Sequence, residues 1–201
     1  MKNRWAGCAK RLAGLMLAAA MTGCASYYVD GSTREVATTQ FKKREQPQAV
    51  QLLFEFQTKG VTNAQATSLL KKRITEQVQT SGLFSEVVEA PVKNGATLSI
   101  VMNNVPMSDD AFSKGFVTGL TFGLAGSQVT DGYVCTASYR GPGDAAGITK
   151  KVRHAIHTTM GAASQPGNAQ KAGSIEEAVT QMSRQVVSQV LNELSQDPAF
   201  Q

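Results

Sequence analysis

Residues 12–21 form an apolar run close to the start of the chain, with a basic segment before it and small residues after it. Ten residues of α-helix rise about 15 Å, half of the roughly 30 Å that the hydrocarbon core of a bilayer requires. The run also lacks the polar residues at helical spacing that a buried amphipathic helix carries. A positive start, a short apolar centre and small residues before a cut are typical of a secretory signal peptide. Residues 1–23 are therefore predicted to be removed.

The run ends in Met21-Thr22-Gly23-Cys24, which resembles the lipobox of bacterial lipoproteins. The resemblance implies cleavage between Gly23 and Cys24 and attachment of a diacylglycerol, and finally of a palmitate-type acyl chain, to the new N-terminal cysteine. Met21 departs from the family's usual Leu, and an ordinary signal peptide with a chance cysteine is the alternative. Two or more acyl chains supply a stable membrane anchor that one chain cannot. Lipoproteins retained at the inner membrane usually carry Asp after the cysteine. Ala stands there in this chain, which implies sorting to the outer membrane with the domain facing the periplasm.

Cleavage before Cys24 would remove 23 of the 201 residues and leave 178, a length that suits a single domain. It would also lower the formal net charge from +5 to +1, because four basic residues precede the apolar run: Lys2, Arg4, Lys10 and Arg11. Nucleic-acid-binding domains are usually strongly basic, so no nucleic-acid partner is predicted.

Cysteine usage excludes an intrachain disulfide in the mature protein. Cys8 would leave with the signal peptide and Cys24 would be lipidated, so Cys135 would be alone. A lone cysteine in an exported protein can be a reactive thiol or pair with another chain. Free cysteine is also among the most buried residue types, and burial is the interpretation favoured for Cys135.

The mature chain divides at Gln48. Residues 24–48 are polar with little periodicity and are predicted to be a lipidated N-terminus and flexible tether, followed by one domain at 49–201. Alternating apolar residues predict strands in five stretches of that domain: 49–57, 83–89, 96–104, 133–139 and 148–160. In the fourth, Tyr133, Cys135, Ala137 and Tyr139 share a face, which supports burial of Cys135. A Gly/Pro-containing loop is predicted over 161–173.

Two segments have helical periodicity. The first follows a capping-box pattern of Thr62 and Gln65, and the second follows one of Ser174 and Glu177. The apolar face of the first helix is Ala66, Leu69, Leu70, Ile74 and Val78, and that of the second is Ile175, Val179, Met182, Val186, Val190 and Leu194. Together the segments predict an α+β two-layer sandwich, with a mainly antiparallel sheet of about five strands covered by two amphipathic helices.

This order of elements, with the lipobox and the motif Ser-Gly-Leu-Phe-Ser-Glu-Val at 81–87, resembles small bacterial envelope lipoproteins. The chain is similar to the YajG-like lipoproteins of unknown function and to auxiliary lipoproteins of envelope transport systems. The resemblance covers the whole chain as topology, and it implies no catalytic residues.

A search for reactive groups predicts neither an enzyme, nor a metal site, nor a cofactor. His154 and His157 are the only histidines, and on a strand a spacing of three places them on opposite faces. Two ligands also fall short of the three or four that zinc sites use. Surface or groove positions are expected for both. The pair Asp109-Asp110 is expected in a loop, and the glycine-rich stretch 141–147 lacks the lysine of a phosphate-binding loop.

Residues 113–128 contain an unusual glycine pattern. Gly115, Gly119 and Gly123 recur every four residues, and Phe116, Leu120 and Leu124 each follow one of them. On a helix the glycines would form one face that allows close approach of a second helix. A strand, or a partly buried connection, fits the pattern as well. The segment is therefore a possible surface for self-association, partner docking or insertion into the leaflet.

Two functions are consistent with these patterns. The first is an outer-membrane-anchored periplasmic lipoprotein that acts as an accessory or structural protein-binding module, through its sheet edge or the glycine segment. The alternative is a carrier of a lipid or other apolar ligand.

Overall fold

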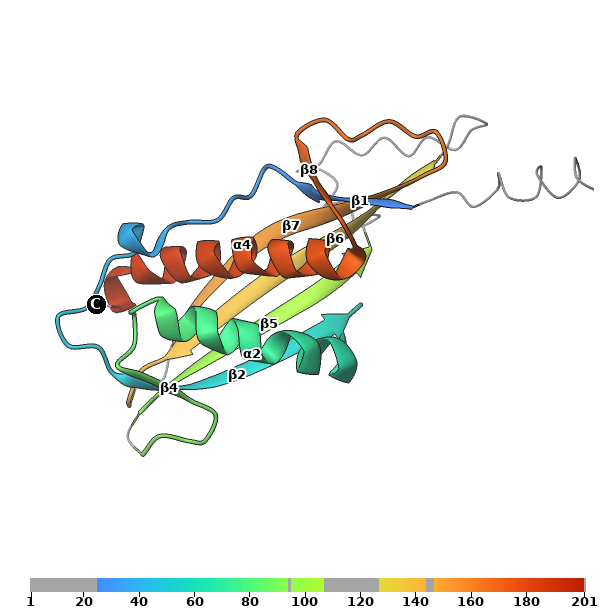
Figure 1. Cartoon of the computed structure of the whole chain (residues 1–201). Coiled ribbons are helices and arrows are strands. Elements are labelled where there is room, and N and C mark those ends of the chain that lie inside the picture. The colour runs from blue at the N-terminus through green and yellow to red at the C-terminus, as the bar shows by residue number, and fades with distance from the viewer. Residues whose placement is uncertain (1–24, 94, 107–126, 144–146, 201) are drawn as a thin grey trace, which may run out of the picture.

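The computed structural model describes residues 25–93, 95–106, 127–143 and 147–200, which form an α+β domain with one sheet and two long helices (Figure 1). The strands are β1 (Ser26–Asp30), β2 (Ala49–Thr58), β3 (Val61–Thr62), β4 (Glu86–Val88), β5 (Ala96–Pro106), β6 (Ser127–Arg140), β7 (Ile148–Met160) and β8 (Ala169–Ala172). The helices are α2 (Ala64–Thr80), α4 (Ile175–Ser195) and two short 3₁₀ helices, η1 (Thr38–Gln40) and η2 (Pro198–Phe200).

The sheet has the strand order β3-β2-β5-β6-β7-β1-β8, and β4 pairs with β2. β2 runs parallel to β5 and to β4, and the other pairs are antiparallel. The predicted α+β class, the mainly antiparallel sheet and the two amphipathic helices are confirmed. The expected number of about five strands is wrong, because the described sheet has eight. The three short strands β1, β3 and β8 had not been predicted.

Both helices lie side by side against the sheet, α4 mainly over β7 and α2 over β2 (Figure 1). Strand alternation supplies the core beneath them, because every second side chain points to the same face. On β6 this face carries Tyr133, Cys135, Ala137 and Tyr139, all buried as the sequence predicted. Cys135 is paired with Met102 of β5 and Val152 of β7, which are buried too.

α2 begins one residue later than its sequence suggested. Asn63, not Thr62, is the N-cap, and its side chain accepts a hydrogen bond from the Ala66 amide. Thr62 instead belongs to β3, where it lies opposite Gln57. Leu69 is 56% exposed rather than part of the buried face, because the helix turns Leu70, Ile74 and Val78 toward the sheet.

α4 begins where the sequence predicted. Ser174 Oγ accepts a hydrogen bond from the Glu177 amide at 3.1 Å, and Glu177 Oε2 accepts one from the Gly173 amide at 2.8 Å. Two carboxylates in the first turn, Glu176 and Glu177, also suit the positive end of the helix dipole. Ile175 was expected on the buried face but is 40% exposed, and it is the first residue of the helix.

Residues 25–48 are not a flexible tether. β1 lies inside the sheet between β7 and β8, with Tyr28 opposite His157 on one side and Lys171 on the other. Val29 is 1% exposed and Phe41 is 5% exposed, and both belong to the main hydrophobic core. The domain therefore includes residues from Ser26 onward.

The segment that follows η1 is fixed by contacts near the C-terminus. The Arg44 guanidinium lies 4.2 Å from the centroid of the Phe200 ring and donates a hydrogen bond of 2.9 Å to Tyr139 Oη. Phe200 is fully buried, in edge-to-face contact with Tyr139 and Phe84. Such aromatic and cation–π contacts add to the energy of burial, so this part of the predicted tether is held to the domain.

Candidate functional site

The described part of the chain has a groove between the two helices. The groove has a volume of about 460 Å³, and residues 35–41 form its third wall. It is lined by Glu35, Val36, Thr38, Phe41, Leu70, Arg73, Ile74, Glu76, Gln77, Thr80, Thr180, Ser183, Arg184, Ser188 and Leu191. We call it the inter-helix groove.

Polar contacts join the two helices across this groove. Arg73 Nη1 donates a hydrogen bond to Thr180 Oγ1 at 2.5 Å, and Gln77 Nε2 donates one to the Arg184 carbonyl at 2.7 Å. Arg184 also forms an ion pair of 2.8 Å with Glu35 of the third wall. These contacts fix the width of the groove while leaving charged groups at its rim.

The third wall is held to α4 by its backbone. The Val36 amide donates a hydrogen bond to Ser188 Oγ at 2.9 Å, and the Gln189 side chain donates one to the Arg34 carbonyl at 2.9 Å. The Lys42 amide donates another to Ser195 Oγ at 3.1 Å. Serines on this face of α4 thus position residues 34–42, which the sequence alone did not place.

The floor of the groove is apolar but offers little free surface. Leu70 and Ile74 are each 1% exposed, and Leu191 is fully buried. The Arg184 and Glu35 side chains at the rim are 56% and 45% exposed. The surface that the groove exposes is nevertheless mainly apolar, with charged side chains at its rim, so a ligand there would meet both kinds of atoms.

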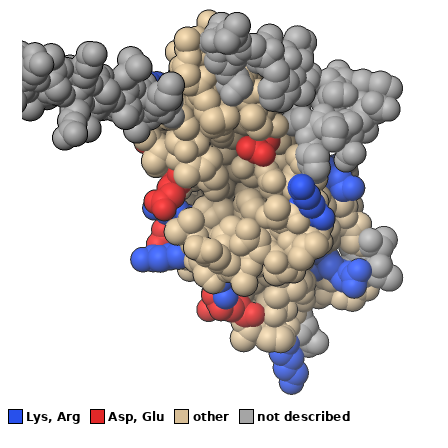
Figure 2. Space-filling view, turned by 90° about the vertical axis from the view of Figure 1, so that its right-hand side faces the viewer, with Lys and Arg blue, Asp and Glu red and all other residues tan. Residues whose placement is uncertain are grey.

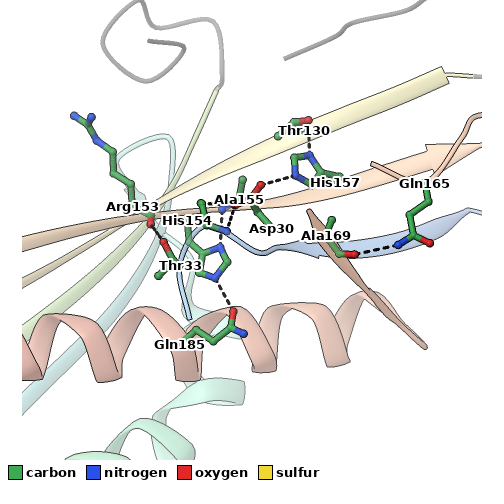
Figure 3. A network of polar contacts seen from close by, with 11 residues as sticks. Asp30, Thr33, Thr130, Arg153, His154, Ala155, His157, Gln165, Ala169 and Gln185 are labelled. Carbon is green, nitrogen blue, oxygen red and sulfur yellow. Dashed lines mark hydrogen bonds and ion pairs between the residues drawn. The ribbon is translucent and has the colours of Figure 1, made fainter. Parts of the chain in front are cut away.

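A second polar cluster surrounds the two histidines of β7 (Figure 3). They lie on opposite faces of the strand, as predicted, and so do not meet at one site. Their expected surface or groove positions are wrong, because His154 is fully buried and His157 is 7% exposed. Each is buried by a partner distant in sequence: Gln185 of α4 for His154, and Asp30 of β1 for His157.

His154 lies on β7 two residues before Ile156, the residue at which the pairing of β1 with β7 ends. Its Nδ1 accepts a hydrogen bond from the Ala155 amide at 2.8 Å, and its Nε2 lies 2.7 Å from Gln185 Oε1. The first bond requires an unprotonated Nδ1, so Nε2 carries the hydrogen and donates to Gln185. Burial lowers the pKa of His154, which agrees with this neutral form.

His157 joins three strands on the other face (Figure 3). Its Nδ1 lies 2.9 Å from Thr130 Oγ1 of β6, and its Nε2 lies 3.2 Å from Asp30 Oδ2 of β1. Ser32 donates both its amide and its hydroxyl to Asp30 Oδ1. The cluster thus ties β1 into the sheet.

Protonation of Asp30 is expected to weaken the fold in acid. Burial alone would raise the pKa of the Asp30 carboxyl, but hydrogen bonds from His157 and Ser32 outweigh burial and lower it from 3.8 to about 2. A pKa lowered by folding stabilises the folded chain above the unfolded pKa, and this stabilisation disappears as the pH falls through the folded value. The contribution is therefore present above about pH 4 and lost between about pH 4 and pH 2.

Asp30→Asn should lower the free energy of unfolding at pH 7 by on the order of 1–2 kcal/mol. The variant should also lose less stability than the wild type between pH 4 and pH 2. Urea denaturation at several pH values would measure both effects. Glu35→Gln, in an exposed ion pair, is the control and should cost about 1 kcal/mol or less. Parallel acid profiles for the wild type and Asp30→Asn would show that Asp30 does not carry the effect.

Cys135 is fully buried, as predicted, and burial raises the pKa of its thiol to about 12. The reactive thiolate is therefore suppressed at neutral pH, which agrees with a packing role.

The residues predicted to carry function lie outside the described part of the chain. These are the lipobox residues Gly23 and Cys24, and the interaction segment Gly115, Phe116, Gly119, Leu120, Gly123 and Leu124. The pair Asp109-Asp110, which was expected in a loop without a functional role, also lies outside the described residues. Within the described residues, no group of three or more His, Cys, Asp or Glu side chains could hold a metal ion. In the same part of the chain, neither helix has the length and hydropathy needed to cross a bilayer.

Sequence reasoning missed the inter-helix groove and the contact of Asp30 with His157. The groove has no motif, because its walls come from three separated segments. Asp30 follows Tyr-Tyr-Val at 27–29, and this short apolar stretch is the one signal that could have indicated a strand there.

No protein-family model matches the chain, and no curated protein matches it either. Among solved structures, a putative neuraminyllactose-binding hemagglutinin homolog from Helicobacter pylori is similar at 12% identity and a TM-score of 0.44, over 76% of this chain and 87% of that chain. The PelC dodecamer from Paraburkholderia phytofirmans matches at 13% identity and a TM-score of 0.34, over 85% and 96% of the two chains. A minor lipoprotein from Acinetobacter baumannii matches at 11% identity and a TM-score of 0.30, over 77% and 90%. At these identities and TM-scores the matches assign neither a family nor a function, and the resemblance to YajG-like lipoproteins stays a prediction.

Proposed function

We propose that this protein is an outer-membrane-anchored periplasmic lipoprotein that acts as an accessory or structural protein-binding module of the cell envelope. Cys24 is the lipidated residue in this proposal. The domain is a two-layer sandwich in which the helices cover one face of the sheet, and its partner binds in the inter-helix groove. The observation that carries the protein-binding role is the groove itself, with its exposed charged rim of Glu35 and Arg184.

The charged rim of the groove favours a protein partner over an apolar ligand. A lipid or other apolar carrier needs free apolar surface, and pockets for such ligands bury most of the ligand among apolar side chains. The groove does expose apolar surface, but Leu70 and Ile74 on its floor are only 1% exposed and its rim is charged. Arginine at the rim is typical of protein interfaces, where it is enriched relative to the rest of the surface. Transport of an apolar ligand is therefore the second candidate.

A catalytic role is not part of the proposal. A histidine between a hydroxyl and a carboxylate also occurs in hydrolases, where the hydroxyl attacks a substrate. In this chain both nitrogens of His157 are occupied by neighbouring strands, and its side chain is 9% exposed. The burial of the imidazole between strands supports a structural role.

The glycine segment with Gly115, Gly119 and Gly123 is a second proposed contact surface, on sequence grounds alone. Its Phe116, Leu120 and Leu124 would supply the apolar contacts.

A photo-reactive amino acid at Arg184 should cross-link a discrete envelope protein in intact cells. Arg184 lines the groove and its side chain is 56% exposed. The control position is Lys72, which is also long, charged and 87% exposed but does not line the groove. Gel mobility and mass spectrometry would identify the product.

Arg184→Ala, combined with the photo-reactive amino acid at Glu76, which also lines the groove and is 59% exposed, should lower cross-linking of that protein about tenfold relative to the same cross-linker with Arg184 present, because arginine is a frequent energetic centre of interfaces. Equal cross-linking at positions 184 and 72 would contradict docking in the groove. Cross-linking of position 184 to a lipid, with no protein product, would favour the alternative function as a carrier of an apolar ligand.

A further inference from the structure

One end of the sheet collects the start of β1, the start of β6, the end of β7 and the start of α4. Ser26 and Gln128 both lie opposite Thr159, on its two sides. Tyr27 lies opposite Ala172 of β8, three residues before α4 begins at Ile175. We call this region the β1 end of the domain.

The β1 end carries an exposed apolar patch, made of Tyr27, Val129, Met160 and Ile175. Val129 is 39%, Met160 41% and Ile175 40% exposed, and Tyr27 is partly buried. Val129 and Tyr27 flank Thr158 in one row across the sheet, and Met160 is two residues farther on the same face. Met160 is a diagonal neighbour of both Tyr27 and Val129, at about 7–8 Å, so these three side chains form one surface. Ile175 lies at the start of α4, near the same end of the sheet. We call it the end patch.

The start of β1 leaves very little chain between this patch and the predicted lipid. Cys24 precedes Ser26 by two positions, and two residues span at most about 7 Å. The hydrocarbon core is roughly 30 Å of a bilayer of about 40–45 Å, so each headgroup layer is about 5–7 Å thick. A cysteine with its acyl chains in the core therefore brings the first residue of β1 to the headgroups.

We propose that the end patch rests on the lipid surface of the membrane that holds the Cys24 acyl chains, so that the domain stands on its β1 end. This inference rests on the lipidation in the proposed function. It adds an orientation: the strands rise from the membrane, and the C-terminal end of α4 points away from it.

The surface character of the β1 end agrees with a lipid occupant. Figure 2 views the side on which β1 begins in Figure 1; much of the described surface there is uncharged, although an acidic group lies in the upper middle of the view and basic side chains lie to its right. Asp131 lies on the same face, two residues beyond Val129. Burial raises the pKa of this carboxyl, although Asn104 partly offsets the effect.

The short spacing also argues against a protein between the patch and the membrane. An α-helix with its side chains is about 10–12 Å across. That diameter exceeds the roughly 7 Å that two residues can span. A lipid surface is thus the occupant that the anchor allows.

Fluorescence quenching in vesicles tests this orientation with the full-length, lipidated protein. Met160→Cys would carry an environment-sensitive probe, and the vesicles would contain phospholipid with a quencher near the headgroup. Leu53→Cys is the matched control, because Leu53 is apolar and 46% exposed. Leu53 lies opposite Ser99 of β5, which in turn lies opposite Ser138 of β6. Ser138 is nine residues beyond Val129 on β6, so the control position is roughly 30 Å from the end patch along the strands. The native Cys135 is fully buried and so does not compete for the probe.

Quenching at position 160 is expected to exceed that at position 53 several-fold, and to be insensitive to salt because the contact is apolar. Val129→Asp should reduce quenching at position 160 toward the value at position 53. Leu69→Asp, at an exposed site on α2, should leave it unchanged.

An anchored protein with equal quenching at positions 160 and 53 would overturn the orientation while leaving the lipidation intact. A probe at position 160 that is shielded from water but not quenched would show that protein, not lipid, covers the patch. Failure of the unmodified protein to enter vesicles would instead overturn the lipidation, and the orientation with it.

Discussion

A chain that begins at Ala49 is expected not to fold, whereas a chain that begins at Ala25 is expected to fold stably. The difference arises because residues 25–48 supply an internal strand and core side chains. β1 lies between β7 and β8, so its removal exposes two sheet edges at once. It also separates β8 from the rest of the sheet, since β8 pairs only with β1 in the described structure.

The size of the effect follows from three buried side chains. Tyr28 is 6%, Val29 1% and Phe41 5% exposed. Burial of one such side chain stabilises a fold by about 1.5–3 kcal/mol, so the three together contribute roughly 5–9 kcal/mol. Whole domains are stable by about 5–15 kcal/mol. The loss is therefore comparable to the entire stability of the domain.

Circular dichroism during thermal unfolding would compare the two chains. The shorter chain should show no cooperative transition, and the longer one should show a single transition. Tyr28→Ala together with Phe41→Ala, in the longer chain, is an intermediate case and should lower the midpoint without changing chain length. A cooperative transition in the chain that begins at Ala49 would show that residues 25–48 are dispensable.

Cys24→Ser should release the protein from the membrane. The substitution removes the thiol that accepts the diacylglycerol, and each buried methylene of an acyl chain contributes about 0.8 kcal/mol of membrane affinity. Loss of all chains therefore removes nearly the whole affinity of the anchor. The product should remain uncut, or be cut elsewhere and appear as a soluble periplasmic form. The domain itself should fold, because its described core begins with residues after Ser26.

Labelling with a palmitate analogue, followed by fractionation of membranes, would measure this outcome. Cys8→Ser is the matched control, since it makes the same substitution in the segment that is predicted to be removed. The control should keep the label and the membrane location of the wild type. Equal labelling of wild type and Cys24→Ser would contradict lipidation at this cysteine.

The long elements could be predicted from periodicity because their own side chains form most of the core. The stretch 148–160 matches β7 from end to end, and the alternating residues of β6 are buried as predicted. The face of α4 from Met182 to Leu194 is likewise buried. In these elements the local pattern and the tertiary packing agree.

The short strands could not be predicted because tertiary contacts decide them. β1 has five residues and β8 has four, Ala-Gln-Lys-Ala, too few to show alternation. β1 is fixed by the bond between Asp30 and His157, which are 127 positions apart. The prediction of Thr62 as the N-cap of α2 was wrong for a related reason. Both Thr62 and Asn63 can cap a helix, and the pairing of Thr62 with Gln57 in β3 leaves the cap to Asn63.

The candidate groove was beyond sequence analysis for a geometric reason. It exists because α2 and α4 pack beside each other and because Ser188 and Ser195 hold the segment that follows β1 along them. None of these residues belongs to a motif. The lipid anchor, in contrast, could be predicted from the sequence, because a peptidase recognises a short linear segment and its recognition does not depend on tertiary structure.

Mass spectrometry of the N-terminal peptide, from protein purified out of membranes, tests most directly the claim that this domain is held at a membrane by Cys24. The mature chain is expected to begin at Cys24, with the mass of that peptide increased by a diacylglycerol and an acyl chain. An N-terminal peptide that begins at another residue, or one that contains an unmodified Cys24, would contradict the account.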